Sequence, residues 1–262
     1  AAAVAIAAAS GFGGRLHLLV SALLMAVAAS VAALSVLAAA LVRPVGVLTL
    51  RSPANLDTVG RWAGKVEEAA AHLGTPPPEV WLGETGSAQV GGQPGVSGCW
   101  AATLWWLDQL GALALRSQRV QCRQTLCGAD YGLLTAQLDT TPDFWASLLW
   151  KRLMGTHAHK VNGARSTVRA YCHRAPASMV STFLVLNLSH EPAEIEISSA
   201  GRALVWLLNA ASLGSRTITI NGVVPEASTD GTLPELHGVP TANPIVLPPG
   251  AAAFIRTGCV RA

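Results

Sequence analysis

Residues 80–88 of the chain read Val-Trp-Leu-Gly-Glu-Thr-Gly-Ser-Ala, an apolar run that stops at a carboxylate. Three prolines precede it at positions 76–78 and small residues follow Glu84, so the pattern predicts a buried strand that ends in an acid. In a parallel β/α architecture, the groups that touch substrate lie where strands end and loops begin, which positions Glu84 for chemistry. A glutamate at a strand end is more often simply solvated, and the pattern alone leaves both readings open.

Helices are expected on both sides of this run. Hydrophobic residues recur at helical spacing over 56–73, with Asn55 as the expected N-cap and Gly74 as the expected stop. Two further helices are expected over 97–115 and 143–154, with an apolar strand over 120–127 between them. This is the strand and helix alternation of a parallel barrel, of which the chain provides only the last two units.

The period of the sequence changes to two from residue 166 onward. Short alternating runs are separated by turn residues, and Asn221-Gly222 is typical of a hairpin turn. The predicted fold class is α/β plus β: the C-terminal portion of a (β/α)8 TIM-type barrel over 45–156, then a β-sandwich domain over 157–262, preceded by a hydrophobic N-terminal helix. The expected sandwich strands are 166–172, 181–187, 193–198, 202–208, 216–221 and 251–256.

The first 44 residues form the hydrophobic segment. No Asp, Glu, Lys or Arg occurs between residues 16 and 42, and about 20 apolar residues suffice to cross a bilayer. A transmembrane or signal-anchor helix, a long secretory signal and an artefact of gene prediction all remain open. Each reading of a genuine segment routes the protein to the secretory pathway, and therefore to a membrane, the cell exterior or a lysosome-like compartment.

Length and charge set further bounds. The chain has 262 residues, a net charge of +3 and only 13% charged residues, and it begins with Ala1. We expect a fragment, an incomplete gene model or a processed product, because a complete barrel alone takes about 250 residues. Six basic and no acidic residues lie between positions 151 and 174, which indicates either a polyanion-binding surface or an ordinary basic linker. We read no nucleic-acid signal in this composition.

The residues around Glu84 closely resemble the heparanase-like glycosidases, glycoside hydrolase family 79. The resemblance continues in one order from residue 48 to the C-terminus. It is carried by Val80–Thr85, Ser87-Ala88, Gly91-Gly92, Pro94, Trp105–Gly111, Arg123-Gln124, Gly128-Ala129, Tyr131, Pro142–Leu149 and Met154–Thr156.

This resemblance implies roles for particular residues. Glu84 matches the nucleophile of a retaining glycosidase, and Gly91, Gly92, Gln124 and Tyr131 match positions that contact the sugar. Retaining hydrolysis also needs a second carboxylic acid about 5 Å away. The family places that acid in an Asn-Glu-Pro motif, which occurs nowhere in the 262 residues.

The chain also departs from the family's pattern. The tyrosine and first glycine that follow the alanine matching Ala88 are replaced here by Gln89 and Val90, which puts the shape of the sugar subsite in doubt. The only look-alike of the acid motif, His190-Glu191-Pro192, falls among the sandwich strands, and we interpret it as a surface turn.

Other candidate residues lie outside the cleft. The resemblance implies a disulfide between Cys172 and Cys259, with the remaining cysteines as free thiols, and Asn187-Leu188-Ser189 is a glycosylation sequon. His157-Ala158-His159 lacks the accompanying ligands of a metal site, so we interpret it as linker. Helical spacing assigns Trp100, Trp105 and Trp106 to the core rather than to sugar stacking, and Trp81 and Trp145 are also assigned there.

The resulting functional hypothesis is a glycosidase that cleaves glucuronide linkages of acidic, heparan-sulfate-like polysaccharides, without its acid/base residue in the sequence given. It is expected to use no cofactor or metal. Its expected partner is the acidic polysaccharide or glucuronide substrate, and membrane anchoring is also possible. The alternatives are a membrane-anchored glycan-binding pseudo-enzyme and an inactive truncated gene product.

Overall fold

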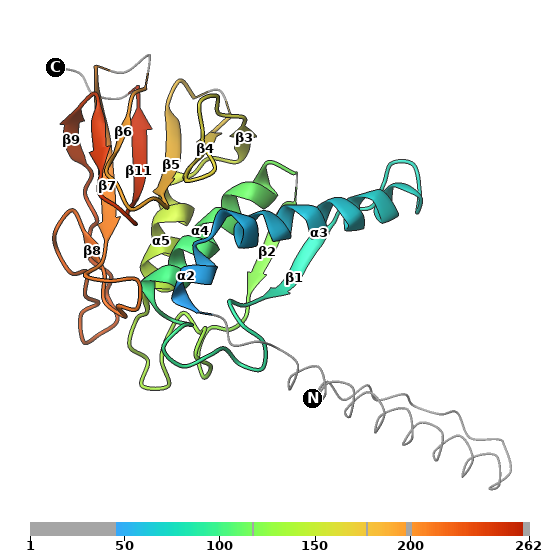
Figure 1. Cartoon of the computed structure of the whole chain (residues 1–262), viewed down its shortest axis with the longest axis horizontal. Coiled ribbons are helices and arrows are strands. Elements are labelled where there is room, and N and C mark those ends of the chain that lie inside the picture. The colour runs from blue at the N-terminus through green and yellow to red at the C-terminus, as the bar shows by residue number, and fades with distance from the viewer. Residues whose placement is uncertain (1–45, 117, 177, 198–200, 259–262) are drawn as a thin grey trace, which may run out of the picture. The chain divides into compact units, whose positions relative to one another are not determined.

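The computed structural model describes residues 46–116, 118–176, 178–197 and 201–258 (Figure 1). The expected hydrophobic helix over 1–44 lies outside the described residues. Within the described ranges, no helix is both long enough and apolar enough to cross a membrane.

The first part of the described chain contains four helices and two strands. Ser52 caps α3, since its side chain accepts a hydrogen bond from the Asn55 backbone and Pro53 occupies the first turn. The predicted cap, Asn55, was therefore wrong by one turn. The elements in order are α2 (Val47–Leu50), α3 (Pro53–Ala71), β1 (Trp81–Thr85), α4 (Trp100–Ala114), β2 (Val120–Arg123) and α5 (Pro142–Leu153).

Strands β1 and β2 pair in parallel. Trp81 lies opposite Val120 and Leu82 opposite Gln121, and the register shifts before Thr85 pairs with Arg123. Helix α4 forms the crossover between the two strands, as parallel pairing requires. The expected strand and helix alternation is confirmed, and both strand ends point to the same edge of the sheet (Figure 1).

The second part is built from antiparallel strands. A seven-stranded sheet has the order β3-β4-β5-β11-β7-β8, with β9 also paired to β7, and β10 pairs with β6 in a separate two-stranded sheet. The strands are β3 (His157–His159), β4 (Val168–Arg174), β5 (Ser181–Asn187), β6 (Ala193–Ile195), β7 (Arg202–Asn209), β8 (Thr219–Ile220), β9 (Val239–Ala242), β10 (Ile245–Leu247) and β11 (Ala252–Thr257).

The two faces of the large sheet enter different cores. Alternate residues such as Leu184, Trp206 and Phe254 pack with Trp100 and other residues of the helices. The intervening residues of β5, β7 and β11 pack with Ile245 and Leu247 of the small sheet. Successive residues of these strands therefore point alternately into two separate cores.

Several local predictions were confirmed and others were wrong. Asn221 and Gly222 have φ values of 51° and 81° and form the expected two-residue hairpin turn. The linker expected at 157–159 is an edge strand, β3, because it pairs with β4. Trp81 was expected in the core but is 61% exposed, since no described element covers its side of β1.

A buried contact joins α4 to β4. The Tyr171 ring lies directly on Gly111, and its hydroxyl donates a 2.6 Å hydrogen bond to the buried carboxylate of Asp108. Beside it, Arg169 forms a 2.8 Å ion pair with Asp57 of α3. Burial raises the pKa of Asp108 above its ordinary value, although the Tyr171 hydrogen bond opposes this shift.

Gly111→Ala should destabilise the chain, because a Cβ at this position would overlap the Tyr171 ring. Overpacking of this kind typically costs about 1–3 kcal/mol. Gly60→Ala is the matched control, since Gly60 also lies inside a helix but has no atom within 4 Å of its would-be Cβ. Urea unfolding should show a loss for the first variant and none for the second, and equal effects would contradict the packing described.

Asp108→Asn should change stability in a pH-dependent way. Because the folded pKa of Asp108 is raised, the ionised carboxyl weakens folding once the pH rises through that folded pKa, whereas the protonated carboxyl does not. The variant should therefore match the parent in acid and become the more stable of the two towards neutral pH. Unfolding free energies measured from pH 4 to 8 test this, with the exposed Glu68→Gln as the control for net charge. A difference that shrinks as the pH rises would overturn it.

Candidate functional site

Glu84 is the penultimate residue of β1, at the end of the sheet where the strands meet the following loops. Its side chain is exposed, and its carboxylate makes no hydrogen bond or ion pair with any described residue. The register shift between Leu82 and Thr85 falls on this part of the strand. An unpaired, exposed carboxylate at the C-terminal edge of a parallel sheet is available to attack an electrophile.

The residue after Glu84 is held firmly. The Thr85 hydroxyl lies 3.1 Å from the Gln109 amide nitrogen of α4. The Thr85 carbonyl accepts a 2.9 Å hydrogen bond from the backbone N–H of Gln124 and a 3.4 Å bond from Arg123. These contacts fix the backbone that carries Glu84 relative to both α4 and β2.

A buried ion pair lies beneath this edge. Arg123 contacts Asp143 at 2.5 Å, and their side chains are only 5% and 0% exposed. Asp143 also accepts a 2.6 Å hydrogen bond from Thr103 and lies in the first turn of α5. The Arg123 guanidinium lies between 5.3 and 5.8 Å from the ring centres of Trp105, Trp106 and Tyr131. The cation is therefore enclosed by one carboxylate and three aromatic faces.

The loops that follow β1 and β2 pack against each other. The Asp130 backbone N–H donates to the Gly91 carbonyl at 2.9 Å. A Cβ at Gly92 would lie 2.9 Å from Asp130 Cβ, and a Cβ at Gly86 would lie 2.7 Å from the Tyr131 ring. Glycine is required at both positions because the neighbouring chain approaches so closely.

The five residues that the resemblance assigns to the cleft lie at the same end of β1 and β2. Glu84 lies one residue before the end of β1, Gly91 and Gly92 lie in the next loop, and Gln124 and Tyr131 follow β2. Tyr131 is only 4% exposed, because its ring covers Gly86, but its hydroxyl makes no hydrogen bond with the described residues. That hydroxyl can therefore serve a ligand. The roles of all five stay predictions.

Two other predicted sites have a different outcome. Cys172 is a buried free thiol on β4, and burial raises its pKa, whereas Cys259 lies outside the described residues, so their pairing stays a prediction. Asn187 is fully buried, and its amide nitrogen donates to the carbonyls of Glu191, Leu247 and Pro248. Glycosylation of Asn187 stays a prediction, and this burial is unfavourable to it, because a glycan replaces one of the two amide hydrogens and needs space beside the nitrogen.

The structure also shows the surroundings of the remaining cysteines, of the His190-Glu191-Pro192 motif and of the basic run. Cys99 is buried, as expected of a structural thiol, and burial raises its pKa, but Cys122 and Cys127 are exposed. His190 and Glu191 are exposed in a turn, as expected. The basic run over 151–174 is not one free patch, since Arg169 pairs with Asp57 and Arg174 donates to Ser181.

Reading the sequence did not assign roles to Arg123 and Asp143. They are 20 positions apart, and only the closure of the loop between β2 and α5 brings them together. A partial signal was present, because an arginine in an apolar strand is unusual and needs a partner. An acidic residue in the first turn of a predicted helix is common, so Asp143 gave no such signal.

Comparison with known proteins identifies the relatives of this fold. No protein family model matches the chain. The chain is 36% identical to a heparanase of Gallus gallus over 178 residues, which cover 62% of the chain and 34% of that protein. It is 35% identical to the baicalin-beta-D-glucuronidase of Scutellaria baicalensis, covering 63% of the chain and 33% of the relative. A heparanase of Bos taurus is 32% identical, with 67% and 36% covered. The chain thus spans about a third of the length of these curated relatives.

Solved structures support the fold. An arabinofuranosidase matches with a TM-score of 0.58 at 13% identity, covering 79% of this chain and 49% of that one. A family 51 alpha-L-arabinofuranosidase from Bifidobacterium longum gives a TM-score of 0.56 at 11% identity, with 80% and 49% covered. A bifunctional glucanase-xylanase from a metagenome library gives 0.56 at 14% identity, with 83% and 41% covered. These TIM-barrel glycoside hydrolases agree with a partial barrel followed by a sheet.

Asp143→Ala should destabilise the chain strongly, because it leaves the Arg123 cation buried without its partner. Breaking a buried pair from one side typically costs about 3–5 kcal/mol. The control is Glu79→Ala, which removes the ion pair between Glu79 and Arg119 at the surface. The Arg119 side chain is 75% exposed and the Glu79 side chain is 55% exposed. An exposed pair is worth at most about 1 kcal/mol. Chemical denaturation of both variants makes the comparison, and similar losses would show that the Arg123 site is not closed to water.

Proposed function

We propose that this chain forms the nucleophile-bearing part of a retaining glycoside hydrolase. Its curated homologues are heparanases, heparanase-like proteins and a glucuronidase. The proposed substrates are glucuronide linkages in acidic polysaccharides of the heparan-sulfate type. The observation that carries the proposal is Glu84, exposed and unpaired at the C-terminal edge of the parallel strands. Such a substrate implies the secretory pathway or the cell exterior as the place of action.

In the proposed mechanism, Glu84 attacks the anomeric carbon while a carboxylic acid protonates the departing oxygen. A glycosyl ester forms on Glu84, and water then releases the sugar with retention of configuration. The hydrogen bonds of Thr85 to Gln109, Gln124 and Arg123 hold the nucleophile's backbone in place during both steps. The hydroxyl of Tyr131 and the backbone of Gly91 and Gly92 are available to bind the sugar.

The acid partner is proposed to come from outside the 262 residues. The family's Asn-Glu-Pro motif is absent from the sequence. Two carboxylates of the barrel part are already committed, since Asp143 pairs with Arg123 and Asp108 accepts from Tyr171. Glycan binding without hydrolysis uses the same cleft, and the assay below separates it from catalysis.

The 262-residue chain by itself should not measurably hydrolyse heparan-type or aryl glucuronide substrates. General acid assistance is typically worth a factor of about 10² to 10⁴, and the chain lacks that acid. A longer polypeptide that adds the upstream barrel sequence should be active. Glycan binding by the longer polypeptide without turnover would favour the pseudo-enzyme alternative.

Glu84→Gln in the longer polypeptide should abolish turnover, and a 2-fluoro glucuronide inactivator should label Glu84 in the parent, as found by peptide mass mapping. Glu79→Gln is the matched control, because Glu79 lies just before the same strand but pairs with Arg119 at the surface. Turnover that survives Glu84→Gln, or a label on another residue, would show that Glu84 is not the nucleophile.

A further inference from the structure

We propose that Cys122 lines the sugar site beside Glu84, so that a thiol-reactive electrophile that modifies Cys122 blocks turnover. The proposal rests on the function proposed for Glu84 and adds to it a residue that the resemblance does not assign. Cys122 is an exposed free thiol on β2. It lies one residue before the end of β2, just as Glu84 lies one residue before the end of β1.

The strand register sets Cys122 directly against Glu84. Between two paired positions, the stretch 82–85 of β1 faces the shorter stretch 121–123 of β2. Gly83 and Glu84 therefore share Cys122 as their single counterpart on the neighbouring strand. Because neighbouring strands lie about 4.8 Å apart, one ligand can contact both the thiol and the carboxylate.

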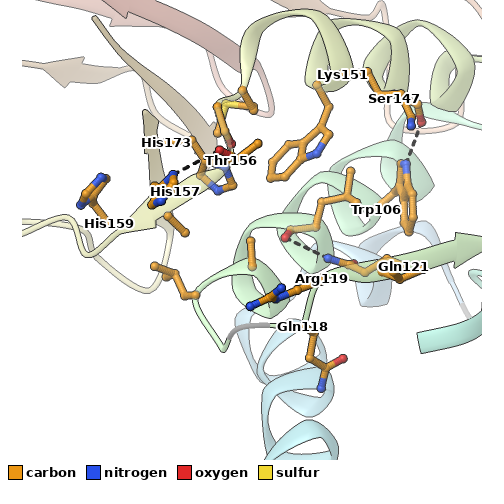
Figure 2. A pocket seen from close by; sticks show the side chains of 18 residues that line it. Trp106, Gln118, Arg119, Gln121, Ser147, Lys151, Thr156, His157, His159 and His173 are labelled. Atoms are coloured by element: carbon orange, nitrogen blue, oxygen red, sulfur yellow. Dashed lines mark hydrogen bonds between the residues drawn. The ribbon is translucent and has the colours of Figure 1, made fainter. Parts of the chain in front are cut away.

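Cys122 points away from the helices that cover β2. On one side of it, Gln121 donates a 3.2 Å hydrogen bond to the Leu110 carbonyl of α4, as Figure 2 shows. On the other side, Arg123 contacts Asp143 of α5. Both neighbours therefore face the helices, and because strand side chains alternate, Cys122 faces the opposite way.

Glu84 points to this same open face. The next residue, Thr85, bonds Gln109 of α4, and alternation turns Glu84 away from that helix. Glu84 and Cys122 are both exposed, and neither lines the cavity of about 1090 Å³ on the helix side of β2. In a complete barrel this open face is the interior, and its residues nearest the strand ends meet the substrate.

A second group at this end of the strands also lacks a partner. Tyr131 is only 4% exposed, yet its hydroxyl makes no hydrogen bond with the described residues. Buried polar groups are seldom left unpaired, so this hydroxyl independently indicates that a polar ligand binds at the end of β1 and β2. A group added to Cys122 would occupy part of the space that such a ligand needs.

Methyl methanethiosulfonate is a suitable probe because the group that it adds is small and removable. The Cys122 thiol loses its proton to the buffer, and the thiolate attacks the sulfenyl sulfur of the reagent. A methylthio group then joins Cys122 as a mixed disulfide, and methanesulfinate leaves. Dithiothreitol reverses the modification by thiol exchange.

The first test uses the longer polypeptide that adds the upstream barrel sequence. Full modification of Cys122, verified by peptide mass mapping, should lower glucuronide turnover at least about tenfold, since a misplacement of about 1 Å can cost about a hundredfold. Dithiothreitol should restore turnover, and a competitive glucuronide inhibitor should protect the thiol. Cys122→Ser should be insensitive when compared with its own untreated sample.

Cys127→Ser is the matched control, because Cys127 is the other exposed thiol within the described ranges. This variant should stay as sensitive to the reagent as the parent. Unchanged turnover after full modification of Cys122, equal inactivation of Cys122→Ser, or an inhibitor that gives no protection would each overturn the proposal.

The second test needs no activity, so it separates this proposal from the function proposed for Glu84. In the 262-residue chain with Cys127→Ser, Glu84→Cys should place a second thiol beside Cys122. Dibromobimane, which alkylates two neighbouring thiols, should then bridge them, as peptide mass mapping detects. Glu79→Cys is the control, because Glu79 is exposed but precedes the start of the strand.

The two tests fail in different ways. A bridge that is missing in Glu84→Cys, or that forms equally in Glu79→Cys, overturns the placement of Cys122 beside Glu84. If the bridge forms but the longer polypeptide shows no turnover before any treatment, the function proposed for Glu84 fails and takes this proposal with it.

Discussion

The buried ion pair between Arg123 and Asp143 organises the edge of the sheet on which Glu84 lies. It joins the end of β2 to the start of α5, and through Thr103 it also fixes α4. Arg123 reaches the Thr85 carbonyl from the same position, so a single cation connects two strands and two helices. Removing charges from water is costly, and the pair persists because the carboxylate, three aromatic faces and a backbone carbonyl all surround the guanidinium. The candidate nucleophile Glu84 is exposed, whereas the side chains of the ion pair behind it are buried.

The large antiparallel sheet carries the rest of the fold by using both of its faces. One face packs on α4 and α5, and the other lies under the small β6–β10 sheet. The contact with the helices is close, since the Tyr171 ring lies on Gly111 and its hydroxyl reaches Asp108. These contacts pack the helices of the partial barrel against the sheet, and β1 and β2 are the only parallel strands within the described ranges.

The hydrophobic pattern of the sequence predicted those elements whose own residues are largely apolar and buried. The bounds of β5 agree with the expectation, because apolar residues fill both faces of that strand. By contrast, β3, β9 and β10 are three or four residues long and exist through pairing with distant partners, which no local pattern reveals. The resemblance around Glu84 selected five residues that the structure places at one end of β1 and β2, and their assignment to a cleft stays a prediction. It did not reveal the ion pair between Arg123 and Asp143, because only the folded path of the chain between β2 and α5 brings these two residues together. It also did not reveal that Asn187 is buried, because a glycosylation sequon says nothing about solvent exposure.

The loop after Glu84 shows how the chain departs from its relatives without changing its path. Val90 has a φ of 56° and is 83% exposed, an unfavourable conformation for a β-branched residue that glycine adopts freely. The Gly92 N–H still closes a turn on the Gln89 carbonyl, and Asp130 still bonds Gly91. The backbone is therefore imposed by packing against the loop after β2 rather than by the preference of Val90. An exposed isopropyl group projects from a backbone that suits glycine, so Val90 changes the surface of the proposed sugar site and leaves the frame that positions Glu84 intact.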